Sequence, residues 1–147
     1  QCALGVSQAR RFPGFLARRR EIAARYDRAF AQESLRSKAR PLAVPAGVTS
    51  AYHLYVINLV PREGEGLASV AERRKALFLA LRERNVGPQV HYIPVHRQPD
   101  FRRNGLSEGS FEGAERYYAG CVSLPMFPLM TDGDVDYVVE AVQECLA

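Results

Sequence analysis

This sequence lacks a hydrophobic run that approaches the roughly 20 apolar residues of a membrane-spanning helix. No stretch near Gln1 combines a charged region, an apolar segment and a small-residue cleavage site, so no signal peptide is expected. The composition, 47% hydrophobic and 24% charged, excludes a disordered or collagen-like chain. We therefore expect a cytoplasmic protein that makes no contact with a membrane.

Cysteine is also scarce, with only Cys2, Cys121 and Cys145 in 147 residues. The number is odd, and no two of these residues have the close spacing of a zinc or redox site. A disulfide-dense mini-protein is excluded, and free thiols in a reducing compartment are expected.

The common catalytic signatures are missing. The sequence contains no Gly-x-Ser-x-Gly, no Gly-x-Gly-x-x-Gly and no Gly-Lys-Ser/Thr phosphate loop. Only Lys38 and Lys75 could form a Schiff base. Lys38 is predicted in a polar loop and Lys75 on a solvent-facing helix surface among arginines, so neither is expected in the apolar pocket that activates such a lysine.

Charge is distributed unevenly along the chain. Residues 1–40 carry ten arginines and lysines against three acidic residues, whereas residues 100–147 carry three arginines against nine acidic residues. The basic part could be a nucleic-acid surface, a solvated helix face, or a helix packed near the acidic C-terminal part. Nucleic-acid binding is disfavoured, because no aromatic or glycine motif accompanies the charge.

The N-terminal half is predicted to be mostly helical. A helix over residues 1–11 is expected to break at Pro13, which would begin a second helix over residues 13–32. Residues 34–50 are predicted as a loop, and residues 51–60 as a buried strand that includes His53 as a structural residue.

The remaining elements alternate between helices and short strands. We predict helices over residues 70–85 and 111–119, strands over residues 89–93 and 121–124, and a long irregular loop that begins at Pro94. Gly87 is expected to take a left-handed cap conformation. Thr131 is expected to cap the last helix with Asp134 as its capping-box partner. The fold class is α/β (α+β), a three-stranded sheet with helices mainly on one face.

Polar side chains that suit binding gather in residues 90–99. His91 and Tyr92 end the predicted strand, and His96 and Arg97 follow in the loop. These groups can hydrogen-bond a phosphate or a sugar hydroxyl, whereas a metal site lacks a third ligand at matching spacing. The alternative stays open that His91 is a core residue and that His96 only caps the loop.

Several motifs together resemble one known family. They are residues 50–57 (Ser-Ala-Tyr-His-Leu-Tyr-Val-Ile), residues 91–99 (His-Tyr-Ile-Pro-Val-His-Arg-Gln-Pro), residues 114–118 (Ala-Glu-Arg-Tyr-Tyr), residues 123–128 (Ser-Leu-Pro-Met-Phe-Pro) and the opening Gln-Cys-Ala-Leu-Gly-Val-Ser-Gln. The sequence resembles the pyridoxal-phosphate-dependent nucleotide-sugar aminotransferases of the DegT/DnrJ/EryC1/StrS type. Residues 91–99 are most similar to the 4-aminotransferases of pseudaminic acid biosynthesis, which act on a UDP-4-keto-sugar.

The resemblance implies the C-terminal part of a fold-type-I aminotransferase that transfers an amino group, from glutamate, to a keto nucleotide-sugar in the synthesis of cell-surface polysaccharide or glycan. Residues 1–33 would link to an absent N-terminal domain that holds pyridoxal phosphate, and residues 34–147 would form the small domain. The Schiff-base lysine would lie upstream, so no catalytic residue is expected here. His91, Tyr92, His96 and Arg97 would contact the substrate, and a homodimer is implied.

The chain begins at Gln1, without a methionine and inside a helical pattern. We therefore expect a processed or cut piece of a longer protein, inactive by itself and without bound pyridoxal phosphate. The rival hypothesis is a free-standing basic module for binding or assembly, without catalysis.

Overall fold

The computed structural model describes residues 2–105 and 111–147. Gln1, which opens the first predicted helix, and residues 106–110, which belong to the predicted irregular loop, lie outside this range. The described helices include none that is both long enough and apolar enough to cross a membrane.

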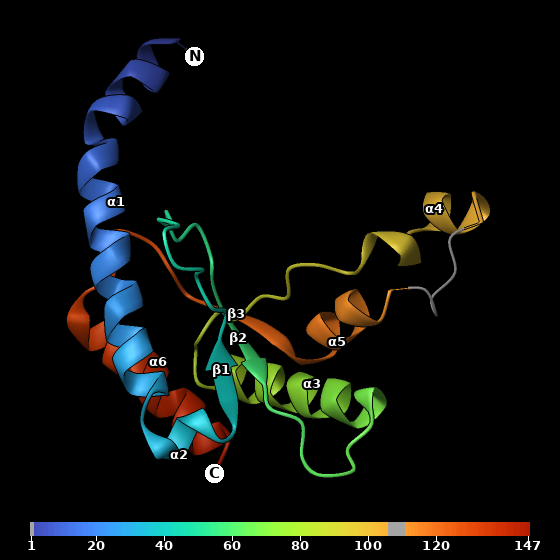
Figure 1. Ribbon diagram of the computed structural model, residues 1–147. Helices are drawn as coiled ribbons and strands as arrows, with labels where there is room; N and C mark the ends of the chain where they lie inside the picture. Colours follow the sequence, from blue (N-terminus) through green and yellow to red (C-terminus); the bar gives the residue numbers. More distant parts are fainter. Residues whose placement is uncertain (1, 106–110) are drawn as a thin grey trace.

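A three-stranded antiparallel sheet lies at the centre of the chain (Figure 1). Its strands are β1 (Ala39–Pro41), β2 (Tyr55–Leu59) and β3 (Cys121–Leu124), with β2 in the middle. Ile57 lies opposite Pro41 on one side and opposite Val122 on the other. The predicted number of strands is confirmed.

The identity of the strands is only partly as predicted. Strand β3 is confirmed, and β2 is confirmed only from Tyr55 onward, so that His53 lies outside it and is exposed. Strand β1 falls in the predicted loop over residues 34–50, and the predicted strand over residues 89–93 is reduced to a bridge between Gln89 and Ser123. A short edge segment such as β1 carries little pattern of its own, because pairing with β2 is what makes it a strand.

One face of the sheet carries most of the hydrophobic core, as predicted. Tyr55, Ile57 and Leu124 point to this face, where they join buried side chains of three helices. The helices are α1 (Cys2–Phe30), α3 (Leu67–Glu83) and α6 (Asp132–Cys145). Burial of this apolar surface is the main stabilising contribution of the fold.

Helix α5 (Glu112–Gly120) lies against the other face. The side-chain amide of Asn58 donates to the carbonyl oxygen of Tyr117 over 2.9 Å. A Cβ atom at position 120 would lie 2.3 Å from the Oδ1 atom of Asn58, so Gly120 allows the helix to end this close to β2. The short segments α2 (Glu33–Arg36), η1 (Val95–Arg97) and α4 (Pro99–Arg103) were not predicted.

The predicted break at Pro13 is wrong, because α1 is a single curved helix that contains this proline (Figure 1). Proline leaves the carbonyl of Ala9 without its helical partner. Residues 2–14 are exposed, so water can bond to the freed carbonyl and the helix continues.

Two predicted helix ends have different outcomes. The N-cap of α6 is confirmed, since the Asp134 amide donates to Oγ1 of Thr131 and the Thr131 amide donates to the Asp134 carboxylate. The left-handed residue after α3 is Asn85, with φ of 56°, and not Gly87 as predicted. Asparagine tolerates this conformation, so it can end the helix two residues earlier than glycine would.

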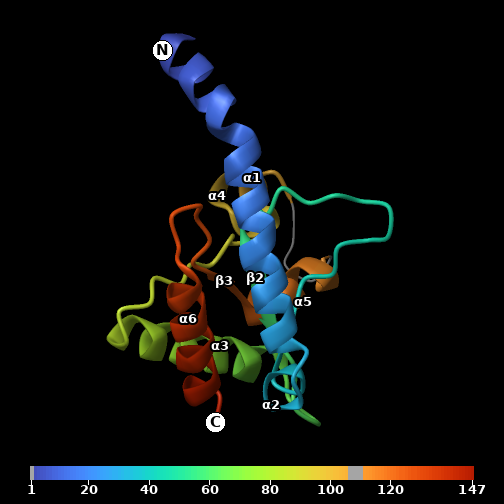
Figure 2. The same cartoon turned by 90° about the vertical axis from the view of Figure 1, so that its left-hand side faces the viewer.

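Oppositely charged residues join α1 to α6, which lie side by side (Figure 2). Arg18 binds Asp132 over 2.8 Å, and Arg25 binds both Asp132 and Asp136. Of the three interpretations of the basic N-terminal part, packing near the acidic C-terminal part is thus confirmed for these two arginines.

Candidate functional site

The predicted binding residues lie along an extended segment that α5 holds in place. This segment runs from the bridge at Gln89 through η1 and into α4. Glu115, in the first turn of α5, reaches both His96 and Arg97, because η1 places these neighbours on the side that faces the helix. One carboxylate therefore fixes two of the four predicted residues.

The contact between Glu115 and Arg97 is a two-pronged ion pair. The Arg97 Nε donates to one carboxylate oxygen over 2.8 Å and a terminal nitrogen donates to the other oxygen. These bonds to Arg97, together with the bond from His96, lower the pKa of Glu115, and the carboxylate in turn raises the pKa of Arg97. Charge-assisted pairs of this geometry are among the stronger polar contacts in proteins.

His96 is almost completely buried, with 4% of its surface exposed. Its Nε2 atom hydrogen-bonds the Glu115 carboxylate, and its ring stacks on Phe111 with the centroids 4.8 Å apart. The Arg97 guanidinium also lies over the ring of Tyr118, at 5.4 Å. His96 and Arg97 thus make well-defined contacts inside the chain.

His91 and Tyr92, unlike His96 and Arg97, each keep a hydrogen-bonding group that is not used inside the chain. The Nδ1 atom of His91 hydrogen-bonds the Ser123 hydroxyl over 2.8 Å, and its carbonyl accepts from the Tyr117 hydroxyl over 3.0 Å. Within the described residues, neither the Nε2 atom of His91 nor the Tyr92 hydroxyl has a hydrogen-bond partner. Tyr92 is 71% exposed, and its ring packs edge-on against His91.

The four predicted residues therefore share one segment but form two groups. His96 and Arg97 are joined through Glu115, whereas His91 is held by Ser123 and leaves its neighbour Tyr92 in solvent. Substrate contact by these residues stays a prediction, and so does the alternative of a purely structural role for the two histidines.

Glu115, Tyr117 and Ser123 position the segment, and none of them was predicted from the sequence to have a role. All three stand in motifs that carried the family resemblance, and that was the only signal that could have found them. Their partners lie 18 to 32 residues away along the chain, a separation that no local periodicity reports.

A second group of contacts surrounds Arg19 of α1. One terminal nitrogen of Arg19 donates to the carbonyl oxygens of Tyr52, His53 and Met126, at 2.9 to 3.0 Å. These bonds hold Tyr52 in a left-handed conformation, with φ of 46°. His53, predicted to be a structural residue of a strand, instead lines the rim of a cavity of about 490 Å³ between α1 and the chain before β2.

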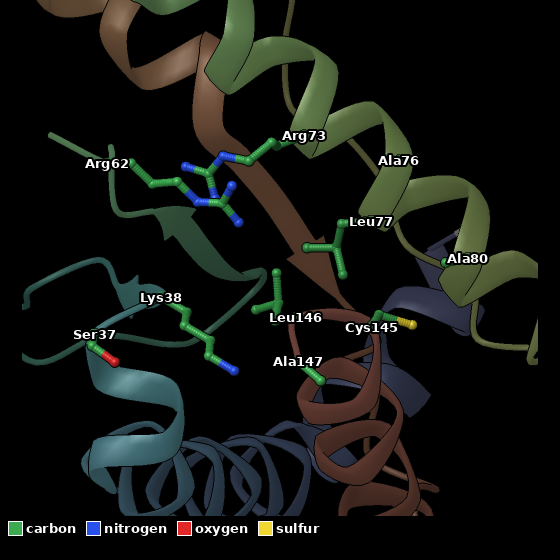
Figure 3. Close-up of a pocket in the computed structure, with 10 residues that line it drawn as sticks. All are labelled: Ser37, Lys38, Arg62, Arg73, Ala76, Leu77, Ala80, Cys145, Leu146 and Ala147. Carbon is green, nitrogen blue, oxygen red and sulfur yellow. The ribbon is translucent and has the colours of Figure 1, made fainter. Parts of the chain in front are cut away.

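Neither lysine is placed where it could hold pyridoxal phosphate beside the predicted binding segment. Lys38 lies in the polar turn between α2 and β1, as predicted, and lines a pocket beside the C-terminal residues Cys145–Ala147 (Figure 3). Lys75 is exposed on α3 beside Glu72, as predicted. The covalent site of that cofactor therefore does not fit the residues of this chain.

Comparison with known proteins decides the family. The model of the DegT/DnrJ/EryC1/StrS aminotransferase family matches residues 1–143. The chain belongs to this family. The resemblance that the motifs predicted is thus confirmed at the level of the family, and one solved relative is known in forms with PMP and PLP.

Relatives in sequence and in structure agree with this membership. The spore coat polysaccharide biosynthesis protein SpsC of Bacillus subtilis is 40% identical over 146 residues, which are 98% of this chain and 35% of that protein. Spr1654 of Streptococcus pneumoniae, described as a sugar aminotransferase and solved in apo, PMP and PLP forms, aligns with a TM-score of 0.83 at 29% identity, over 97% of this chain and 33% of that one.

Helicobacter pylori PseC, an aminotransferase involved in the biosynthesis of pseudaminic acid, also aligns with a TM-score of 0.83, at 25% identity over 98% of this chain and 36% of its own. The chain thus spans about a third of the length of the relatives that it matches.

Proposed function

We propose that this chain is the C-terminal part of a pyridoxal-phosphate-dependent enzyme that transfers an amino group from an amino acid, glutamate, to a keto nucleotide-sugar. The observation that carries the proposal is the family match over residues 1–143. Likeness to SpsC favours a role in the synthesis of a cell-surface polysaccharide, and likeness to PseC favours a 4-keto sugar of the pseudaminic acid type. The complete protein would work in the cytoplasm as a homodimer.

In this proposal residues 1–33 join residues 34–147, the small domain, to an N-terminal domain that supplies the Schiff-base lysine. The first half of α1 extends beyond the rest of the chain (Figures 1 and 2). At its base lies the cavity of about 490 Å³, whose apolar lining includes Phe12, Phe15 and Phe127. Exposed apolar surface of this kind suits the N-terminal domain of the same protein.

We assign different tasks to the two groups of binding residues. Tyr92 and His91 offer a hydroxyl and a ring nitrogen that can hydrogen-bond the phosphate or sugar oxygens of the substrate. His96 and Arg97 contribute to the same surface while Glu115 holds them in position. This division would let the segment present a fixed shape to a bulky substrate.

The proposal is tested first on the complete protein that carries this sequence. With pyridoxal phosphate, L-glutamate and a UDP-4-keto-sugar, we expect an amino-sugar nucleotide, detected by mass spectrometry. The 147-residue chain alone should show no visible absorption of lysine-bound cofactor. Absence of product with every keto nucleotide-sugar, together with salt-sensitive binding of a random DNA duplex by the chain, would favour the basic binding module instead.

The assigned contacts are tested by kinetics of the complete enzyme. Tyr92→Phe and His91→Gln should each raise KM for the nucleotide-sugar about tenfold, since a lost bond to a charged group weakens binding by about 1.5 kcal/mol or more. Tyr137→Phe is the matched control, because its hydroxyl donates to the carbonyl of Arg84, the residue that follows α3. If all three variants keep the parental KM while activity persists, the contact assignment is wrong and the aminotransferase proposal stands.

A further inference from the structure

Strand β3 carries one side-chain hydroxyl, that of Ser123, between apolar neighbours. Ser123 is 3% exposed, and Val122 and Leu124 on either side of it belong to the core. A buried hydroxyl weakens a fold unless it forms hydrogen bonds, so packing alone does not explain a serine at this position. The contact that this hydroxyl makes does explain it.

The Ser123 hydroxyl contacts the ring of His91. Its oxygen lies 2.8 Å from Nδ1 of His91, and it has no other hydrogen-bond partner among the residues that the structure describes. If Nδ1 carried the hydrogen, the hydroxyl would accept that bond and its own buried hydrogen would remain unpaired. The hydroxyl therefore donates to Nδ1, and in the neutral ring the hydrogen belongs to Nε2.

The backbone around His91 keeps this contact in register. Gln89 and Ser123 exchange two backbone hydrogen bonds, of 3.0 and 2.8 Å, which fix the chain two residues before His91. From α5, the Tyr117 hydroxyl donates to the His91 carbonyl over 3.0 Å. The Nε2 atom of His91 has no partner in the described part of the chain, and the exposed ring of Tyr92 lies beside it.

We propose that Ser123 is a positioning residue that holds His91 with its hydrogen on Nε2, so that His91 donates a hydrogen bond to the substrate. The inference rests on the proposed function, which gives His91 a substrate contact. The atom that His91 binds is then an acceptor, either a phosphate oxygen of the nucleotide or an oxygen of the sugar. Tyr92, whose ring packs against His91, adds a hydroxyl to the same surface.

This tautomer also limits what His91 can do. Because Nε2 carries the hydrogen, it has no lone pair with which to remove a proton from the substrate or to bind a metal ion. A shift of the hydrogen to Nδ1 would free that lone pair, but it would leave the Ser123 hydroxyl without an acceptor. His91 is therefore assigned to binding and not to proton removal.

The tautomer is tested by two-bond proton–nitrogen NMR spectra of the 147-residue chain with isotope-labelled histidine. The spectra are recorded at about pH 8.5, where an ordinary imidazole is neutral, and His91→Gln identifies the His91 signals. We expect Nδ1 to show the shift of an unprotonated nitrogen and Nε2 that of a protonated one. In Ser123→Ala the two shifts should approach each other, because both tautomers become populated.

Ser37→Ala is the matched control, because the Ser37 hydroxyl donates to the carbonyl of Glu33 in α2. It should leave the His91 signals unchanged. The proposal is overturned if Nδ1 of His91 carries the hydrogen in the parent chain, or if Ser123→Ala keeps the parental shifts. Circular dichroism checks the fold of each variant, and the parent spectrum decides by itself if Ser123→Ala unfolds. The spectra need no enzymatic activity, so their failure leaves the proposed function untouched.

The positioning role is tested on the complete enzyme. Ser123→Ala should raise KM for the nucleotide-sugar about threefold and change kcat by less than about twofold, as expected for a weakened hydrogen bond to the substrate. It should add no further change to His91→Gln, because Ser123 acts through that ring. An equal rise in KM with and without the His91 ring would overturn the proposal.

Inhibition of the same enzyme by the nucleoside diphosphate alone separates the two acceptors. If a phosphate oxygen accepts the bond, Ser123→Ala weakens this inhibition by the same factor as KM, and if a sugar oxygen accepts it, the inhibition is unchanged. If His91→Gln keeps the parental KM, the substrate contact of His91 is overturned, and the NMR spectra alone decide whether Ser123 sets the tautomer.

Discussion

The two halves of α1 belong to one helix, yet only the second half is packed. Phe12 is 55% exposed, whereas Phe30 is 2% exposed in the core beside Tyr55. Both halves are helical, so local conformation does not distinguish them. The difference lies in tertiary partners, because the sheet and α6 cover residues 15–30 and nothing in the described chain covers residues 2–14.

The two halves of this continuous helix therefore present different surfaces: the first half is exposed, and the second half packs against the rest of the chain. Leu4, Val6 and Phe12 of the first half expose apolar surface to solvent. Arg18 and Arg25 instead fix the second half to α6.

Phe30→Ala should destabilise the chain strongly. Truncation of a buried phenylalanine removes apolar contacts and leaves a cavity, at a cost of about 3–5 kcal/mol in the free energy of unfolding. The equivalent change in the first half, Phe12→Ala, should cost less than about 0.5 kcal/mol, because its ring is exposed. Urea unfolding followed by circular dichroism measures both, and equal losses would show that the two halves are equally packed.

Arg19→Met should cost about 1–3 kcal/mol, since three carbonyl oxygens lose the charged donor that joins α1 to the chain before β2 and to the chain after β3. Arg20→Met is the control, because Arg20 makes one long bond of 3.4 Å to the Ser50 carbonyl. Urea unfolding compares the pair. A similar midpoint for the two variants would contradict a special role for Arg19 at the boundary between the halves.

Arg25→Gln should flatten the acid dependence of stability. The bond to Arg25 lowers the pKa of Asp136 in the folded chain, so its stabilising contribution is complete above about pH 4, the ordinary Asp range, and is lost as the pH falls through the lowered value. The variant should therefore be less stable than the parent at pH 7, and the difference should shrink as the pH falls below the ordinary Asp range.

Thermal unfolding between pH 2 and pH 7 measures this difference. Arg28→Gln is the control for the loss of a positive charge, because Arg28 is exposed on the same helix and its guanidinium has no recorded partner in the described chain. A parallel offset of Arg25→Gln from the parent at every pH would contradict the assignment.

Pro13→Ala should have the smallest effect on global stability. The change restores the amide that can donate to the Ala9 carbonyl, so amide hydrogen exchange of residues 9–13 should slow. The urea midpoint should stay unchanged, because the exposed half does not unfold together with the core. A gain that approaches the roughly 3 kcal/mol cost of an interior proline would mean that both halves unfold as one unit.

Prediction from sequence succeeded best for structural features that depend on residues close together in the sequence. Thr131 and Asp134 form the expected capping box, because a cap depends only on residues three apart. Strand β3 was also predicted. Prediction failed where the conformation of a segment depends on a strand that is distant in the sequence. Strand β1 is an example, because it exists as a strand only through its pairing with β2.

The family resemblance depended on the residue identities in short motifs more than on hydrophobic periodicity or charge. The resemblance implied substrate contacts for His91, Tyr92, His96 and Arg97, and the polar pattern alone left a structural role open. The predicted strand that precedes them is a single bridge at Gln89. Their positions depend on Glu115 and Ser123, which come from α5 and β3. No spacing within residues 90–99 could indicate those partners.

The sequence by itself determined the class of fold, the helical periodicities, the cap of α6 and the family, since all of these are encoded in nearby residues or in shared motifs. Only the tertiary structure decided that Pro13 lies inside a helix, that Glu115 holds His96 and Arg97, and that the Ser123 hydroxyl binds the ring of His91. The physical reason is that these features depend on solvent exposure and on contacts between residues far apart in the chain.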